Sequence, residues 1–151
     1  MASKTYPILE AVGVQLAAIR VDAGFNTDIG TNIFLDDRQR EGNARPSICI
    51  GSRSGRISRS DERNGSGRVL SAKARGMDLI IEAAMSVGAD GAHDAGHEML
   101  EDIERSFDAR TCAAPLGVID VRLDSWQILD RPDGIDAAVL QILGSVDYVR
   151  K

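Results

Sequence analysis

The chain has 151 residues, of which 43% are hydrophobic and 27% are charged, and its formal net charge is −5. These values are typical of one globular domain with its own core, and they exclude wholesale disorder. Aromatic residues make up only 4%, which argues against a base-stacking platform for single-stranded nucleic acid. The sequence contains no apolar run near the roughly 18 residues that a membrane span needs, and no signal-like apolar stretch, so neither membrane insertion nor secretion is expected.

The first third of the chain predicts one helix and two short strands. Pro7 suits the first turn of a helix, and apolar residues then recur at helical spacing. Gly24 suits a C-terminal cap, so we expect this helix over residues 6–22. Short apolar runs predict strands at residues 33–35 and 46–51; a proline opens the second, where no ladder donor is needed.

Residues 52–68 form a basic arm in which Ile57 is the only apolar residue. The arm is too polar to pack into a core. Its length and composition predict a long mobile loop or hairpin between strands. Its net charge is +3, which leaves −8 for the rest of the chain. The arm could dock on an acidic neighbouring subunit, contact nucleic acid or remain a solvated connection, and we expect docking. The candidate interaction residues are Arg53, Arg56, Arg59, Arg63 and Arg68.

The second half of the chain predicts a strand, a helix and a C-terminal hairpin. Apolar and polar residues alternate over residues 77–87, which favours a strand, although its alanines leave a helix as an alternative. Residues 91–107 carry an apolar stripe at helical spacing. Two extended runs, residues 124–129 and 138–148, are joined across a Pro-Asp-Gly turn at residues 131–134, after an irregular connection.

This order of elements predicts an α+β fold. We expect one mostly antiparallel sheet of four to five strands, with two helices packed on one face. Leu140, Ile142, Val146 and Tyr148 share one parity of the last strand and should face the core.

The pair His93 and His97 is the only cluster that suggests catalysis or metal binding. Two histidines one helical turn apart can share a metal, but a hydrolytic zincin needs Glu directly after the first, where this chain has Asp94. Together with Glu101 and Glu104, both histidines lie opposite the apolar stripe, so we expect them in solvent. A small zinc hydrolase built on them remains an alternative.

Catalytic and cofactor motifs are otherwise missing from the sequence. It contains no GxSxG motif, no Walker glycine loop and no GxGxxG after a strand. Cys49 and Cys112 lack the CxxC spacing of a zinc or redox site and are expected to be reduced thiols. We therefore expect a non-enzymatic protein without a cofactor or metal.

The order and spacing of several segments resemble the tail terminator proteins of long-tailed bacteriophages, of the minor tail protein U type. The segments that carry the resemblance are the first helix, Gly24-Phe25-Asn26-Thr27-Asp28-Ile29-Gly30, Ile33-Phe34, Pro46, Met77-Asp78-Leu79-Ile80-Ile81-Glu82 and Val146-Asp147-Tyr148. The sequence departs from the family by Asp36-Asp37-Arg38 and by its richer arginine arm. The resemblance covers most of the chain and implies one terminator-like domain over residues 1–151.

The resemblance implies a hexameric ring on the head-proximal end of the tail tube. Such a ring stops tube polymerisation and presents the surface to which the connector of the capsid attaches. It places the protein in the virion, with its own copies, the tube protein and the connector as partners and with DNA passing through the lumen. Two alternatives remain: another head-tail connector or head completion protein, and a nucleic-acid-binding module that uses the arginine arm.

Overall fold

A computed structural model describes residues 6–35, 46–57, 73–87, 91–109, 118–129 and 137–150. The two helices are α1 (Tyr6–Leu16) and α2 (Ala92–Ala109). The strands are β1 (Ile33–Leu35), β2 (Ser47–Gly51), β3 (Gly55–Ile57), β4 (Lys73–Ser86), β5 (Val118–Ile128) and β6 (Ala137–Arg150). Two short 3-10 helices, η1 (Val21–Ala23) and η2 (Ile29–Thr31), lie between α1 and β1. Neither helix in these segments combines the length and apolar character of a membrane-crossing helix.

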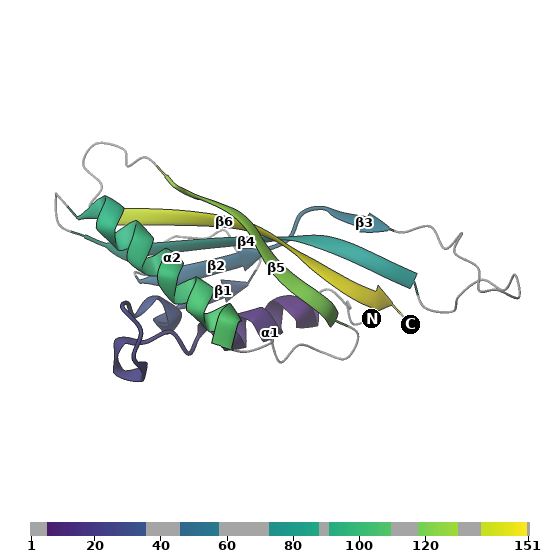
Figure 1. Ribbon diagram of the computed structural model, residues 1–151, viewed down its shortest axis with the longest axis horizontal. Coiled ribbons are helices and arrows are strands. Elements are labelled where there is room, and N and C mark those ends of the chain that lie inside the picture. Colours follow the sequence, from purple (N-terminus) through teal and green to yellow (C-terminus); the bar gives the residue numbers. More distant parts are fainter. Residues whose placement is uncertain are drawn as a thin grey trace, which may run out of the picture.

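The strands form one sheet in the order β1-β2-β4-β6-β5. Only the β1–β2 pair is parallel among the described strands, so the predicted mostly antiparallel sheet is confirmed. β4 and β6 are paired from Lys73 with Arg150 to Ser86 with Ala137, and they run along the long axis of the molecule (Figure 1). The short β3 pairs with β4 at the end of the sheet that lies away from the start of α2 (Figure 1).

Both helices cover the same face of the sheet, as the sequence predicts. The register places Ile50 beside Ile81 and Ile81 beside Ile142, so these side chains point to one face. They belong to one hydrophobic cluster with Val12 of α1 and Met99 of α2. All five side chains are essentially inaccessible to solvent. The core is therefore a single layer of aliphatic side chains between the sheet and the two helices.

The predicted first helix is too long. α1 ends at Leu16, and the chain then turns so that both Ile19 and Ile29 enter the core with 0% exposure. A backbone hydrogen bond of 3.0 Å from Gly30 to the carbonyl of Ile19 closes this turn. A helix continued to residue 22 could not bring these two isoleucines together. Gly24 has a positive φ of 93°, as expected of a cap, but it caps η1.

The C-terminal hairpin is longer than predicted, while its face assignment is confirmed. β5 begins at Val118, within the region that the sequence assigns to an irregular connection. Leu140, Ile142 and Val146 are buried, and Tyr148 is half-buried. The predicted turn at residues 131–134 lies outside the described residues. The predicted central strand is present as β4, so strand rather than helix is correct there.

Candidate assembly surfaces

The basic arm leaves the sheet from a structured base. Its first residues follow β2 directly, and residues 55–57 form β3 against β4, a strand that the sequence does not predict. Arg53 is exposed, and the backbone of Arg56 lies in β3. The remaining predicted interaction residues, Arg59, Arg63 and Arg68, lie outside the described residues.

Asp78 of β4 holds the first residues of the arm in place. One oxygen of its carboxylate accepts hydrogen bonds from the Ser52 hydroxyl at 2.7 Å and from the backbone N–H groups of Arg53 at 2.8 Å and Ser54 at 2.9 Å. In return, the backbone N–H of Asp78 donates to the carbonyl of Ser54 at 2.8 Å. The chain is thereby fixed where it passes from β2 to β3.

The same contacts lower the pKa of Asp78. Its partial burial by itself raises the pKa, because removal from water disfavours the charged form. The hydrogen bonds from Ser52, Ser54 and Arg53 stabilise the carboxylate and more than offset that effect. The pKa therefore lies below its ordinary value of 3.8, and the carboxylate is charged at neutral pH.

The second face of the sheet carries a polar network and is not covered by any described helix. Gln127 of β5 donates to Gln141 of β6 at 2.6 Å, across the strand pair. Farther along, Arg122 forms an ion pair with Asp147 at 3.3 Å. Apolar groups interrupt the network, notably Leu143, whose side chain is 44% exposed. This open face, defined by β4, β5 and β6 residues that point away from the helices, offers mixed polar and apolar contacts.

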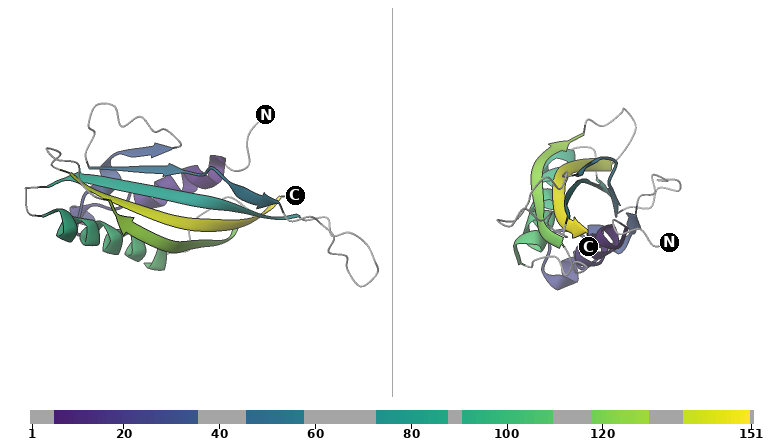
Figure 2. Two further views of the ribbon diagram at one scale, coloured as in Figure 1. Left: turned by 90° about the horizontal axis from the view of Figure 1, so that it is seen from above. Right: turned by 90° about the vertical axis from the view of Figure 1, so that its right-hand side faces the viewer.

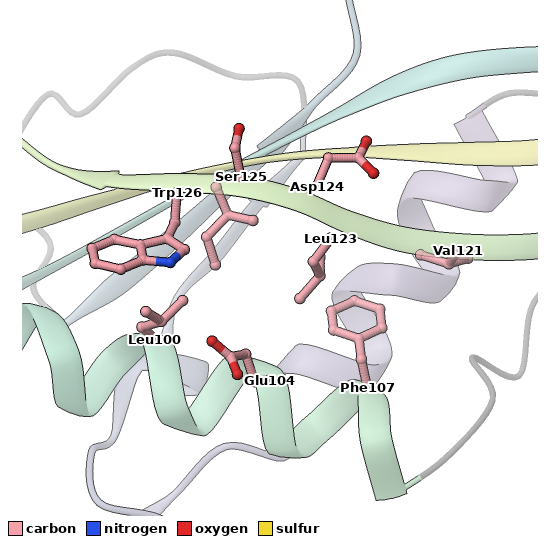
Figure 3. A pocket seen from close by; sticks show the side chains of 9 residues that line it. Leu100, Glu104, Phe107, Val121, Leu123, Asp124, Ser125 and Trp126 are labelled. Atoms are coloured by element: carbon pink, nitrogen blue, oxygen red, sulfur yellow. The ribbon is translucent and has the colours of Figure 1, made fainter.

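A groove separates α2 from β5 on the helix-covered side of the molecule. It has a volume of about 410 Å³ and is lined by Leu100, Glu104, Phe107, Val121, Leu123, Asp124, Ser125, Trp126 and Ile142. Figure 3 shows Leu100, Glu104 and Phe107 rising from α2 towards β5, while Trp126 comes down from β5 and Asp124 points away. Because β5 is the last strand of the sheet, the groove opens at the sheet edge.

The histidine region of α2 has no described metal-binding cluster. His97, Glu101 and Glu104 are exposed, as predicted, whereas the side chain of His93 lies outside the described part of the chain. The ring of His97 makes an edge-to-face contact with Trp126, with 5.5 Å between ring centroids. Within the described segments no three His, Cys, Asp or Glu side chains gather as a metal site would need.

Sequence reasoning misses the buried acid of α2, Asp102. Its carboxylate accepts three hydrogen bonds from the connection that contains Asn26 and Thr27, and its side chain is 0% exposed. The only signal in the sequence is its position beside the buried Ile103, which places an acid at the margin of the apolar stripe. Its role is to attach the connection between α1 and β1 to α2.

Comparison with known proteins gives a likeness in fold but no match in sequence. No protein family and no curated protein sequence matches the chain. Among solved structures, a chain of the "Virion of native gene transfer agent (GTA) particle" has a TM-score of 0.60 and 14% sequence identity to this chain. The match covers 99% of this chain and 100% of the other. The two chains therefore share a fold over their whole lengths.

Proposed function

We propose that this protein is a bacteriophage tail terminator, a structural protein of the virion at the head-tail interface. Copies of the chain form a ring, a hexamer, on the head-proximal end of the tail tube. The ring ends tube polymerisation and provides the surface for joining to the head. The observation that carries the proposal is the end-to-end likeness in fold to a chain from a gene transfer agent virion, at a TM-score of 0.60. This likeness supports a structural role in a virion, and the narrower role of terminator comes from the resemblance of the sequence.

The described surfaces are compatible with ring formation. A closed ring needs heterologous contacts, in which one surface of a copy meets a different surface of the next copy. The chain offers the sheet edge at β5, the open face of the sheet and the base of the basic arm. Exposed strand edges readily pair with other chains. No catalytic reaction and no cofactor belong to this proposal.

The charge distribution suits a channel for DNA. Outside the basic arm the chain carries a net charge of −8. Carboxylates that face a lumen repel phosphates, so DNA passes through without specific binding. The proposal therefore expects acidic residues to line the lumen, while the basic arm lies between copies.

The proposal is tested with the purified full-length protein and tail tubes assembled from the tube protein of the same particle. Native mass spectrometry is expected to show a closed oligomer of six copies, and electron microscopy should show it on one end of each tube. Tubes capped in this way should not elongate when more tube protein is added. A protein that stays monomeric and leaves tube growth unchanged would refute the proposal.

Two other outcomes identify the alternatives. If the rings bind the capsid connector but neither bind nor arrest tubes, the protein is a connector or head completion protein. If the chain binds DNA with an affinity that falls steeply with salt concentration and forms no ring, it is a nucleic-acid-binding module that uses its arginines.

A further inference from the structure

The groove between α2 and β5 combines an aromatic wall with an acidic group. Trp126, the only tryptophan of the chain, is 48% exposed at this groove. Glu104 points into the gap between Leu100 and Phe107, as Figure 3 shows. Glu104 is exposed, and no described cation forms an ion pair with it. A carboxylate and an exposed indole, whose ring also contacts the ring of His97, therefore line the same groove over a floor of aliphatic side chains.

This combination suits a guanidinium group. Arginine stacks its planar group on an aromatic face and can pair with a carboxylate through the same group. The chain already uses the first of these contacts elsewhere, because the guanidinium of Arg105 lies 5.0 Å from the centre of the Phe25 ring. Lysine lacks the planar group, and an acidic or purely apolar ligand would leave Glu104 without a countercharge.

The chain supplies a ligand of this chemistry in its own basic arm. Residues 52–68 contain five arginines and one apolar residue, and the arm carries the positive charge that the remainder of the chain lacks. Its base is fixed to β4 by Asp78 and β3. Residues 58–72 separate the paired ends of β3 and β4, and a chain of this length can extend at most about 25 Å out and back.

We propose that the groove between α2 and β5 binds an arginine of the basic arm from a neighbouring copy. The guanidinium stacks on Trp126 and pairs with Glu104. This inference rests on the proposed function, because it requires that copies of the chain associate. It gives that association a direction, since the arm of each copy reaches the groove of the next, as a heterologous ring contact demands.

The fold favours an arm from a second copy over the arm of the same chain. The arm leaves the sheet beside β4, at the end away from the start of α2 (Figure 1). The end-on and side views in Figure 2 place β3 and β5 on different sides of the paired strands β4 and β6. To reach its own groove, the arm would have to reverse direction and cross β6. The groove of a second copy does not impose this path.

Trp126 makes the inference directly measurable, since all tryptophan fluorescence of the protein comes from the groove. The full-length protein is expected to show an emission shift to shorter wavelength as its concentration rises through the range in which it associates. Replacing Glu104 with Arg should weaken association by about tenfold or more, because an ion pair becomes a like-charge contact. Glu10→Arg, an equal charge change at an exposed position of α1, is the matched control and should leave both signals unchanged.

A complementation experiment tests whether the arm acts between copies. The variant with Arg56, Arg59 and Arg63 all replaced by Glu should associate poorly alone, as should Glu104→Arg. Mixing the two variants should restore the emission shift, since the reversed arm of one then meets the reversed groove of the other. If the emission maximum lies at the shorter wavelength at every protein concentration, the arm occupies the groove of its own chain, and the inference is overturned. Circular dichroism confirms that each variant is folded.

Failure of this inference can be distinguished from failure of the proposed function. Suppose that six-membered rings form and that neither Glu104→Arg nor the triple arm variant changes Trp126 emission or ring stability. The groove inference is then wrong, and the terminator function stands. If neither rings nor capped tubes form with the wild-type protein, both are wrong. Restored association in the mixture, together with rings in the wild type, supports both.

Discussion

Asp102 of α2 accepts two hydrogen bonds from Thr27, one from its backbone N–H at 2.8 Å and one from its hydroxyl at 2.6 Å. The same carboxylate accepts a third hydrogen bond, from the backbone N–H of Asn26 at 2.9 Å. Asp102 and Thr27 are both buried, at 0% and 2% exposure. One acidic side chain thus joins the connection between η1 and η2 to the helix.

We predict that Asp102→Ala lowers the free energy of unfolding by about 2 to 4 kcal/mol, because it leaves two buried donors of Thr27 and the part-buried N–H of Asn26 without an acceptor. Urea denaturation at neutral pH measures the change. Glu98→Ala, at an exposed position of the same helix, is the control and should stay within about 0.5 kcal/mol of the wild type. An equal response of the two variants would show that the buried contacts contribute nothing.

The lowered pKa of Asp78 should make the free energy of unfolding depend on pH. Hydrogen bonds from the base of the arm hold its folded-state pKa below 3.8, so the folded protein binds this proton less readily than the unfolded chain does. Its contribution is present above pH 3.8 and is lost as the pH falls through the folded-state pKa. In Asp78→Asn this contribution should be missing. The difference in free energy of unfolding between wild type and variant should therefore shrink as the pH falls from neutral to below 3.8, and a constant difference would contradict the assignment.

The sequence predicts those parts of the fold whose signal is periodic. Buried and partly exposed residues alternate over residues 77–83 of β4 and, with one fully exposed position, over residues 140–146 of β6, and α2 carries a stripe that includes Met99 and Ile103. These patterns identify which face meets the core without knowledge of the partner. The sheet, its helix-covered face and the solvent-facing position of His97 follow from them.

Features that depend on distant partners do not show in the sequence. β3 is rich in glycine and arginine and has no alternation; it is a strand because β4 pairs with it and Asp78 fixes the preceding turn. Asp102 looks like one more acid of a charged helix until its partners, 75 residues earlier, are known. Trp126 and Glu104 line the same groove only because α2 packs beside β5.

The position of Gly30, in the connection that follows α1, has no room for a larger side chain. A Cβ atom at this position would lie 2.5 Å from the carbonyl oxygen of Leu16 and 2.7 Å from that of Ile19, and backbone atoms cannot move away cheaply. Gly30→Ala should therefore destabilise the protein by about 2 to 3 kcal/mol in thermal or urea unfolding. Gly91→Ala is the control without a clash, because a Cβ there meets nothing within 4 Å, and the change should cost less than about 1 kcal/mol, from the less favourable residue before α2. Equal stability of the two variants would show that the turn adapts.

Ile142 and Leu143 are neighbours in β6 that point to opposite faces of the sheet. We therefore expect their replacement by alanine to change the stability of the monomer by different amounts. Ile142 is 1% exposed within the core, so Ile142→Ala should cost about 2 to 5 kcal/mol of unfolding free energy, as should Leu140→Ala. Leu143 is 44% exposed on the open face, and Leu143→Ala should cost less than about 1 kcal/mol in the monomer.

If the open face contacts a neighbouring copy in the proposed ring, Leu143→Ala should affect association more than Ile142→Ala does, the reverse of their effects on stability. Leu143→Ala should then weaken ring formation in sedimentation measurements under conditions in which the monomer remains folded. Ile142→Ala, studied at a temperature where most molecules are folded, should leave the contact between folded copies intact because its side chain does not reach the open face. If Leu143→Ala assembles as well as the wild type, this part of the open face lies outside the ring contacts, and the sheet edge and the basic arm must hold the copies together.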